Sequence, residues 1–217
     1  MQHNILPEET WEMKNTSKDN ILFEIYQELG ECYTHTQNLG KAMEHFNLAM
    51  QIDNSSERPY IGIGVALLQQ NKSAEAKKHF EEALARNPNS DTAVAGLAMA
   101  LSGNGQTIEG FQKYQEALDI NPENMSALMG VITGAYSFER FDVAVSYLQN
   151  YLALYPGNIK ILYCLAGTYV KLNRLDDASE VLKKIFIFEP NHAASHELLK
   201  KVDMLQHEDP YRKCQNS

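Results

Sequence analysis

Two histidines near the C-terminal end have a spacing that metal sites use. His192 and His196 lie four residues apart, and on one helix this separation can bring two imidazoles to a single ion. No motif ties a third ligand to them. We therefore interpret the pair as histidines at the start of a helix and expect neither a metal nor any other cofactor.

The cysteines do not point to catalysis. Cys32, Cys164 and Cys214 form an odd, widely separated set without metal-like or paired spacing, as expected for reduced thiols that serve as small packing residues. The sequence contains no glycine-rich phosphate loop after a strand and no recognisable arrangement of serine, cysteine or histidine around a nucleophile. We expect a protein that is not an enzyme.

The charge balance narrows the classes of partner. Nineteen basic residues against 28 acidic residues give a formal net charge of −9, which repels phosphate backbones and anionic lipid surfaces. The first residues are polar and interrupted by Pro7, and no apolar run approaches the roughly 20 residues of a membrane-spanning helix. We expect a cytoplasmic protein that neither binds nucleic acid nor inserts into membranes.

The chain is organised as a repeat of 34 residues. Prolines recur at this interval, at Pro88, Pro122, Pro156 and Pro190. Within residues 57–90, two runs of helical periodicity flank a polar turn, so each repeat predicts one helix-turn-helix hairpin.

This unit resembles the tetratricopeptide repeat. The family pattern is met within residues 57–90 by Tyr60, Ile63, Gly64, Leu67, Ala76, Phe80, Ala83 and Pro88. The resemblance implies an all-α fold, a right-handed superhelical solenoid of antiparallel helix hairpins. It fixes an architecture and not a partner, because such arrays bind many unrelated ligands.

The repeat phase predicts how the chain is divided. We expect an N-terminal arm outside the repeat phase at residues 1–22, a capping helix at 193–206 and a polar tail at 207–217. The five repeats between them are expected at 23–56, 57–90, 91–124, 125–158 and 159–192. The capping helix would shield the last open face of the array.

In arrays of this kind, the leading helix of each repeat lines an inner wall that binds ligands. In the first repeat these places hold Glu24, Gln27, Glu28 and Glu31. The wall of the later repeats is mostly apolar and small, and we predict the following partner-binding residues there: Arg58, Ile61, Gly62, Val65, Leu68, Ala95, Gly96, Met99, Met129, Gly130, Thr133, Tyr136, Tyr163, Cys164, Gly167 and Val170.

The composition of this wall argues for one ligand class over another. Chaperone-binding members of the family grip a C-terminal carboxylate with lysine, arginine and asparagine, whereas the matching places here hold Gln27, Glu31, Gly62 and Gly96. An apolar peptide or helix fits the wall better. The glycines either widen this groove or only let neighbouring hairpins pack closely.

Two apolar residues lie outside this pattern. Trp11, in the N-terminal arm, is a candidate anchor that docks on the chain's own groove or on a partner. Ile187 falls at an outward-facing place and marks a candidate docking or self-association patch, unless the capping helix or tail covers it.

These observations together predict a non-enzymatic scaffold or adaptor that holds a mainly apolar peptide, helix or partner subunit in its concave groove. An assembly factor or stable accessory subunit of a larger enzyme complex is the first alternative. A self-associating, homo-oligomeric scaffold is the second.

Overall fold

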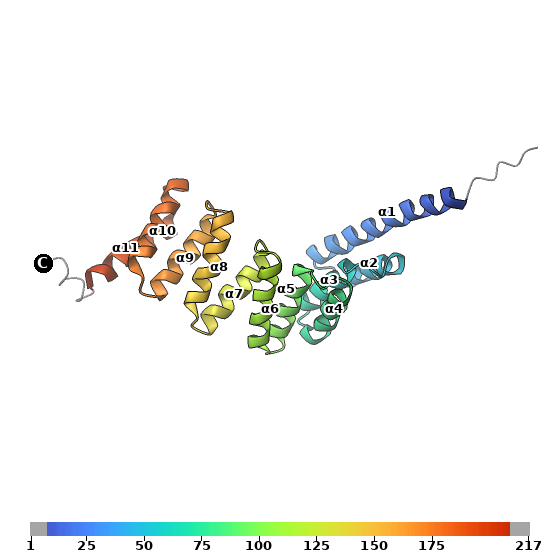
Figure 1. The fold of residues 1–217 in the computed structure, drawn as a ribbon, viewed down its shortest axis with the longest axis horizontal. Helices are drawn as coiled ribbons and strands as arrows, with labels where there is room; N and C mark the ends of the chain where they lie inside the picture. Colours follow the sequence, from blue (N-terminus) through green and yellow to red (C-terminus); the bar gives the residue numbers. More distant parts are fainter. Residues whose placement is uncertain (1–7, 209–217) are drawn as a thin grey trace, which may run out of the picture. The chain divides into compact units, whose positions relative to one another are not determined.

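The computed structural model describes the backbone of residues 8–208 and the side chains of residues 18–207. Within these ranges it contains eleven helices and no strand, which confirms the predicted all-α fold of antiparallel helix hairpins (Figure 1). The chain divides into two compact units, unit 1 at Met1–Asn121 and unit 2 at Pro122–Ser217.

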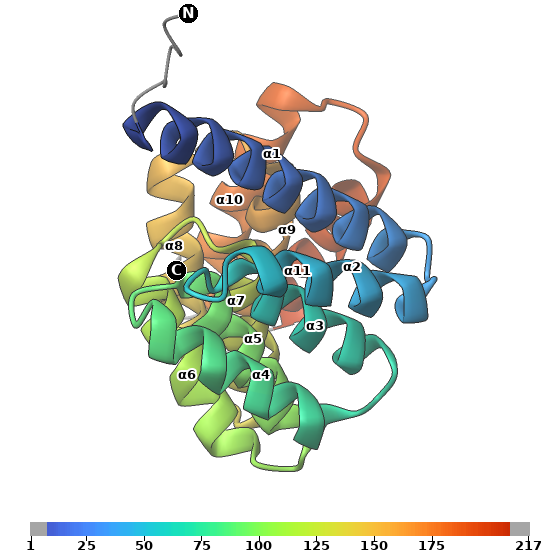
Figure 2. The same ribbon diagram turned by 90° about the vertical axis from the view of Figure 1, so that its right-hand side faces the viewer.

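Unit 1 contains three hairpins, each made of a leading helix and a second helix. They are α1 (Glu8–His35) with α2 (Leu39–Ile52), α3 (Arg58–Gln69) with α4 (Ser73–Arg86), and α5 (Asp91–Gly103) with α6 (Thr107–Ile120). The leading helix α3 packs against both α1 and α5, so the three leading helices form one layer (Figures 1 and 2).

Unit 2 contains two hairpins and a final helix. They are α7 (Met125–Ser137) with α8 (Phe141–Leu154), α9 (Ile159–Lys171) with α10 (Leu175–Phe188), and α11 (Ala193–Glu208). Helix α11 packs against α9 and α10 and buries Ser195 and Val202 completely, whereas Leu205 is exposed. None of the helices within residues 8–208 is long and apolar enough to cross a membrane.

Helix α1 is much longer than the sequence analysis suggested. It begins at Glu8, so residues 8–22 continue the leading helix, whose expected start was Phe23. Between Glu8 and Gly30 the sequence contains neither glycine nor proline, so no helix-breaking residue interrupts this segment. Trp11 lies on this added segment, but its side chain is outside the described residues.

The same repeat position caps several leading helices. The side chains of Ser90, Asn124 and Asn158 each accept a hydrogen bond from the backbone N–H three residues on, at 3.3, 2.9 and 3.2 Å. At the next equivalent place, Nδ1 of His192 accepts from the backbone N–H of Ser195 at 3.3 Å. The caps therefore start these helices in a common register.

A residue with left-handed backbone conformation closes the turn inside each hairpin. Positive φ angles occur at Gln37 (62°), Asn71 (58°), Gly105 (82°), Glu139 (54°) and Asn173 (55°), each 34 residues from the last. Glycine and asparagine adopt this conformation readily, whereas glutamine and glutamate do so at a cost. The turn is thus set by the repeat geometry and not by the residue that occupies it.

Two phenylalanine rings fill the core between consecutive leading helices of unit 1. The ring of Phe46 lies against Gly30 and Gly62, and that of Phe80 lies against Gly64 and Gly96. A Cβ at any of these glycines would overlap the ring, and both rings are completely buried. Close packing therefore explains Gly62 and Gly96, and this favours the packing interpretation over a widened groove.

Candidate functional site

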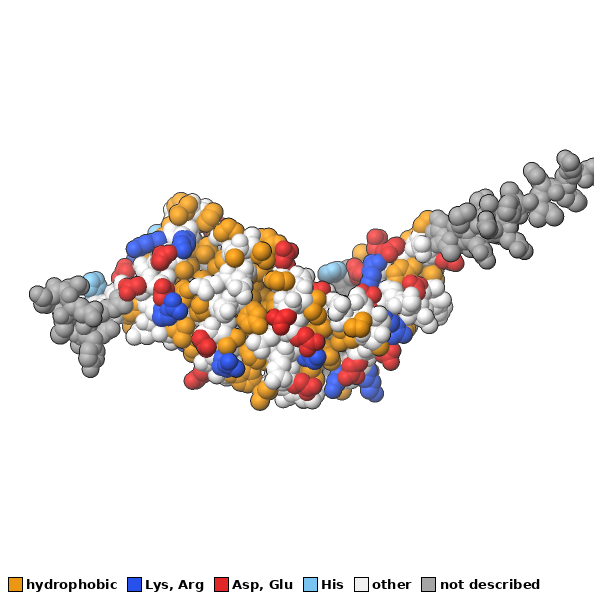
Figure 3. Space-filling view, in the orientation of Figure 1, with side chains coloured by type: hydrophobic (Ala, Val, Ile, Leu, Met, Phe, Trp, Pro, Cys, Tyr) orange, Lys and Arg blue, Asp and Glu red, His pale blue; other side chains and the backbone are white. Residues whose placement is uncertain are grey.

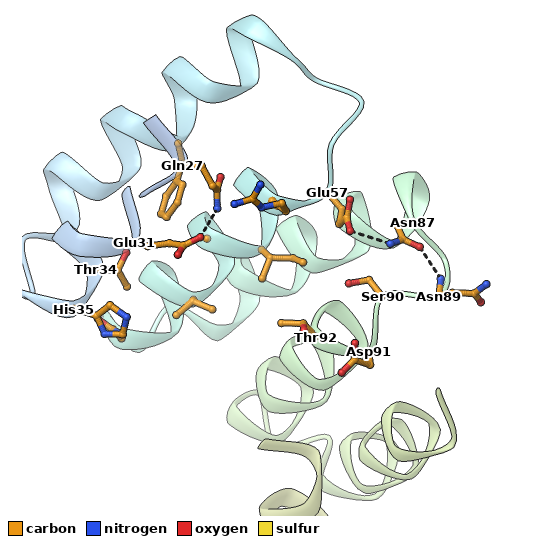
Figure 4. A pocket seen from close by; sticks show the side chains of 16 residues that line it. Gln27, Glu31, Thr34, His35, Glu57, Asn87, Asn89, Ser90, Asp91 and Thr92 are labelled. Atoms are coloured by element: carbon orange, nitrogen blue, oxygen red, sulfur yellow. Dashed lines mark hydrogen bonds between the residues drawn. The ribbon is translucent and has the colours of Figure 1, made fainter. Parts of the chain in front are cut away.

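A pocket of about 530 Å³, which we call the unit 1 pocket, lies among α1, α3 and the chain that enters α5 (Figure 4). It opens on the layer of leading helices. Its lining consists of Gln27, Glu31, Thr34, His35, Phe46, Glu57, Arg58, Ile61, Gly62, Val65, Gln69, Asn87, Asn89, Ser90, Asp91 and Thr92.

The apolar part of the lining comes from α3 and from the core beneath it. Ile61 and Val65 lie four residues apart, so they occupy one face of α3, and both are half-buried. The buried ring of Phe46 continues this surface next to Gly62. The pocket therefore contains an aliphatic surface against which a ligand can bury its own apolar groups.

Gln27 is the most deeply buried polar group of the lining. Its side chain is only 2% exposed, and its Nε2 donates a hydrogen bond to Oε1 of Glu31 at 2.9 Å. Its Oε1 is buried and has no hydrogen-bond partner among the described residues. A buried acceptor without a partner is unfavourable unless something else supplies a donor.

The charged groups of the lining are mainly acidic. Glu31 comes from α1, Glu57 directly precedes α3, and Asp91 is the first residue of α5. Arg58 contributes a guanidinium group to the lining, and its Nη1 donates to both carboxylate oxygens of Glu24 at 2.7 and 2.9 Å. The positive charge of Arg58 is thus offset within the protein.

Asn87 holds the loop between α4 and α5, which lines the pocket opposite α1. Its Nδ2 donates to Oε1 of Glu57 at 2.9 Å, and its Oδ1 accepts from the backbone N–H of Asn89 at 3.2 Å (Figure 4). Glu57 therefore has an amide partner, and within the described residues neither Glu57 nor Glu31 forms an ion pair with a cation.

Some residues of the predicted binding wall meet at the unit 1 pocket. Arg58, Ile61, Gly62 and Val65 line the unit 1 pocket, as do Gln27 and Glu31. Outside its lining, Leu68 is half-buried on α3, Ala95 is buried on α5, Gly96 packs on Phe80, and Met99 is 43% exposed. Glu28 is exposed on α1 and does not line the pocket.

The remaining predicted wall residues lie in unit 2. Met129, Gly130, Thr133 and Tyr136 are on α7, and Tyr163, Cys164, Gly167 and Val170 are on α9. Met129 is 46% exposed, and the hydroxyl of Tyr136 lies 3.0 Å from Oγ1 of Thr168, which joins the two helices. These residues thus share two neighbouring leading helices, with an exposed methionine on one of them.

Sequence analysis missed the polar residues that enter the pocket from between the helices. These are Glu57 and the run Asn87, Asn89, Ser90 and Asp91. A signal was present, because Glu57 and Asp91 are separated by one repeat and both are acidic, whereas the next two equivalents are Met125 and Ile159. The acidic pair marks the part of the array where the inner wall is polar.

The groups considered for chemistry have structural partners. His192 caps α11, and Nε2 of His196 lies 2.8 Å from the carbonyl oxygen of Pro190. Within the described residues no group of three or more metal-binding side chains gathers. Burial raises the pKa of the Cys164 thiol, which keeps it protonated and weakly nucleophilic at neutral pH. Cys214 lies outside the described residues.

Ile187 is exposed, as its repeat position predicts, at 77%. It belongs to a larger set of exposed apolar side chains at the ends of α8 and α10, with Leu154, Tyr155 and Phe188. Hydrophobic side chains gather over these helix ends in the space-filling view (Figure 3). We call this set the unit 2 apolar patch.

Models of the tetratricopeptide repeat family match three segments of the sequence, residues 23–56, 61–130 and 135–202. The chain is a tetratricopeptide repeat protein. The predicted family is therefore confirmed, and its fold is that of a protein–protein interaction scaffold. No curated protein sequence matches the chain significantly.

Several solved structures share this fold. The crystal structure of YrrB, described as a tetratricopeptide repeat protein with an unusual peptide-binding site, has a TM-score of 0.59 at 22% identity and covers 81% of this chain and 90% of its own. PilF of Pseudomonas aeruginosa has a TM-score of 0.69 at 16% identity, with 92% and 99% covered. MamA has a TM-score of 0.62 at 16% identity, with 80% and 94% covered. At these identities the likeness concerns the fold alone.

Proposed function

We propose that this tetratricopeptide repeat protein is a non-enzymatic scaffold or adaptor that binds a mainly apolar peptide, helix or partner subunit on its leading helices. The observation that carries the proposal is the unit 1 pocket, where Ile61 and Val65 form an apolar floor beneath polar walls. Pockets that combine apolar surface with a few placed polar groups are typical binding sites. The peptide-binding site named for YrrB gives a precedent on the same fold.

Site-specific photocrosslinking tests this proposal. A benzoylphenylalanine at Ile61 should capture peptides that are selected on the full chain from a displayed random library. The same group at Lys78, an exposed residue of α4 outside the pocket lining, is the matched control and should capture none of them. Equal capture at both positions, or failure to select any peptide, would contradict binding at this surface.

The first alternative, a stable subunit or assembly factor of a larger enzyme complex, predicts a different kind of association. A tagged chain should then be recovered in fixed stoichiometry with the same proteins even after washes at high ionic strength. A transient adaptor should lose its partners in those washes, because weak interfaces with many polar contacts dissociate readily. The result distinguishes permanent from exchanging partners.

The second alternative, self-association, is favoured by the unit 2 apolar patch. Exposed clusters of large apolar side chains commonly mark contact surfaces. If the patch joins two copies, light scattering should show a dimer that Ile187→Lys converts to a monomer, while Lys184→Glu on the exposed surface of the same helix should leave the dimer intact. A monomer at all concentrations would remove this alternative.

Two further expectations remain proposals. The division into five repeats followed by a capping helix is supported by helices α3, α5, α7 and α9, whose starts at residues 58, 91, 125 and 159 are 33 or 34 residues apart. A cytoplasmic location is the second of these proposals. Microscopy of the full chain fused to a fluorescent protein at its C-terminus would test the location.

A further inference from the structure

The unit 1 pocket contains a buried hydrogen-bond acceptor without a donor, and a purely apolar ligand would leave it unpaired. Gln27 is almost completely buried, yet its Oε1 has no donor within the described residues. The orientation of the amide is fixed by its neighbour, because the carboxylate of Glu31 can only accept and therefore requires Nε2 on its side. The end of the amide that lacks a partner is consequently its acceptor Oε1, and a ligand that displaces the groups covering this buried atom would supply the missing donor.

The charges around this acceptor favour a cation over a neutral donor. Glu31, Glu57 and Asp91 supply carboxylates to the lining, and Figure 4 shows Glu31 on one side of the pocket and Glu57 and Asp91 on the other. The basic groups of the lining are the guanidinium of Arg58, which Glu24 already binds through both oxygens, and the imidazole of His35. A further cation would meet more negative than positive charge here.

The floor of the pocket suits the stem that carries such a cation. Ile61 and Val65 present aliphatic surface within the same pocket as Glu31 and Gln27. Lysine and arginine bury their methylene stems on apolar surface while the charged head meets polar groups. One side chain can therefore use both the floor and the acidic wall.

We propose that the unit 1 pocket binds an extended peptide through a lysine or arginine side chain, whose stem lies on Ile61 and Val65 and whose head is bound by Glu31 and Oε1 of Gln27. The inference rests on the proposed peptide-binding function and names the class of peptide. The pocket would thus prefer a positively charged group, whereas a carboxylate clamp prefers a negatively charged one.

Selection of peptides on the full chain separates this inference from the function on which it rests. A displayed library of random linear peptides should yield sequences enriched in lysine or arginine beside aliphatic residues. Enrichment of acidic or purely apolar sequences would overturn the charge preference and leave peptide binding intact. If no sequence is enriched on the full chain, both proposals fail.

A double-mutant cycle with a selected peptide then locates the cation. In the peptide, the basic residue is replaced by norleucine, which keeps the stem and removes the charge. In the protein, Glu31→Gln removes the carboxylate charge but still accepts from Nε2 of Gln27. The matched control is Glu28→Gln, the same change at an exposed place on α1 outside the pocket.

The expected result is coupling between the two changes. Glu31→Gln should weaken the basic peptide about tenfold, as the loss of a hydrogen bond to a charged group does, and should leave the norleucine peptide nearly unchanged. Glu28→Gln should affect both peptides equally and slightly. Additive effects of Glu31→Gln and norleucine would overturn the placement of the cation at Glu31.

Gln27→Met is the second variant, because it keeps the length of the side chain and removes the acceptor. The basic peptide should bind several-fold more weakly, while the thermal unfolding temperature of the free protein should not fall. A purely structural role for Gln27 would give the reverse pattern, with lower thermal stability and unchanged preference for the basic peptide over the norleucine peptide, and this result would overturn its assignment to the site.

Discussion

The ring of Phe80 lies against the backbone of Gly64, so that a Cβ on Gly64 would come within 2.7 Å of the ring atom Cζ. Phe80 cannot move aside, because its ring atoms Cε1 and Cζ also lie against Gly96 and its side chain is completely buried. Gly64→Ala should therefore lower the free energy of unfolding by about 1–3 kcal/mol through overpacking. Chemical denaturation of the full chain measures this change.

Gly167 provides the matched control for Gly64. It lies in the interior of α9, and a Cβ there would meet nothing within 4 Å. Gly167→Ala should raise the free energy of unfolding by about 1 kcal/mol, since alanine favours the helix over glycine. Two changes of equal sign would show that the close approach of Phe80 to Gly64 does not determine the outcome.

A second stability prediction concerns the crossing of α3 and α4. Ala83 is completely buried on α4, where the two helices pack together. Ala83→Leu should lower the free energy of unfolding by about 1–3 kcal/mol, because no space exists for the added methylene groups. Ala85→Leu, at an exposed place two residues further along α4, should change it by less than about 0.5 kcal/mol. A neutral Ala83→Leu variant would show that the crossing is loosely packed.

The turn between α7 and α8 offers a stabilising change. Glu139 has a φ of 54°, a conformation that glycine adopts without a steric penalty. Glu139→Gly should raise the free energy of unfolding by about 1 kcal/mol. Glu139→Ala removes the same carboxylate but keeps the strain and should give no gain. Urea midpoints of the two variants separate backbone conformation from charge.

A pH dependence follows from His79 on α4. Burial lowers the pKa of this histidine below its ordinary value of 6.5, against the opposing charges of Glu82 and Glu75. Below pH 6.5 the unfolded chain therefore binds a proton more readily than the folded chain, so the free energy of unfolding should fall as the pH decreases through this range. In His79→Leu this part of the dependence should be absent. A histidine contribution that grows toward acidic pH would show that Glu82 and Glu75 outweigh burial.

The sequence predicted the fold well because every repeat carries the same small and large residues at the same places. Ala76, Phe80 and Ala83 are all completely buried, as the family pattern implies. Gly110 was harder to interpret, since glycine in a helix suggests a soft position. In the structure a Cβ at Gly110 would come to 2.8 Å from the carbonyl oxygen of Ala98, so glycine is there because the two helices cross closely.

The lining of the unit 1 pocket was only partly predictable from the sequence, for a physical reason. Periodicity indicates which residues share one face of a helix, and Arg58, Ile61 and Val65, which it places together, all line this pocket. Asn87 and Asn89 enter the pocket from a loop, and no periodicity describes which way a loop side chain points. Oε1 of Gln27 can be recognised as an unpaired acceptor only because Nε2 of the same amide donates to Glu31, and this hydrogen bond is visible only in the three-dimensional structure.

The last prediction tests whether partner binding extends beyond the unit 1 pocket. Met99 on α5 and Met129 on α7 are large apolar side chains that are 43% and 46% exposed on leading helices. A flexible thioether at such a place adapts to the shape of an apolar ligand, and a carboxylate there would have to be desolvated on binding. Met99→Glu combined with Met129→Glu should therefore abolish partner binding in a pull-down. Helical circular dichroism should not change, because both places are partly exposed and a glutamate there can keep its carboxylate in water. Met204→Glu, at a 63% exposed place on α11, is the control for added charge and should leave binding intact. If the partner still binds the double variant with its original affinity, the ligand contacts neither methionine and the predicted wall is limited to the residues of the unit 1 pocket.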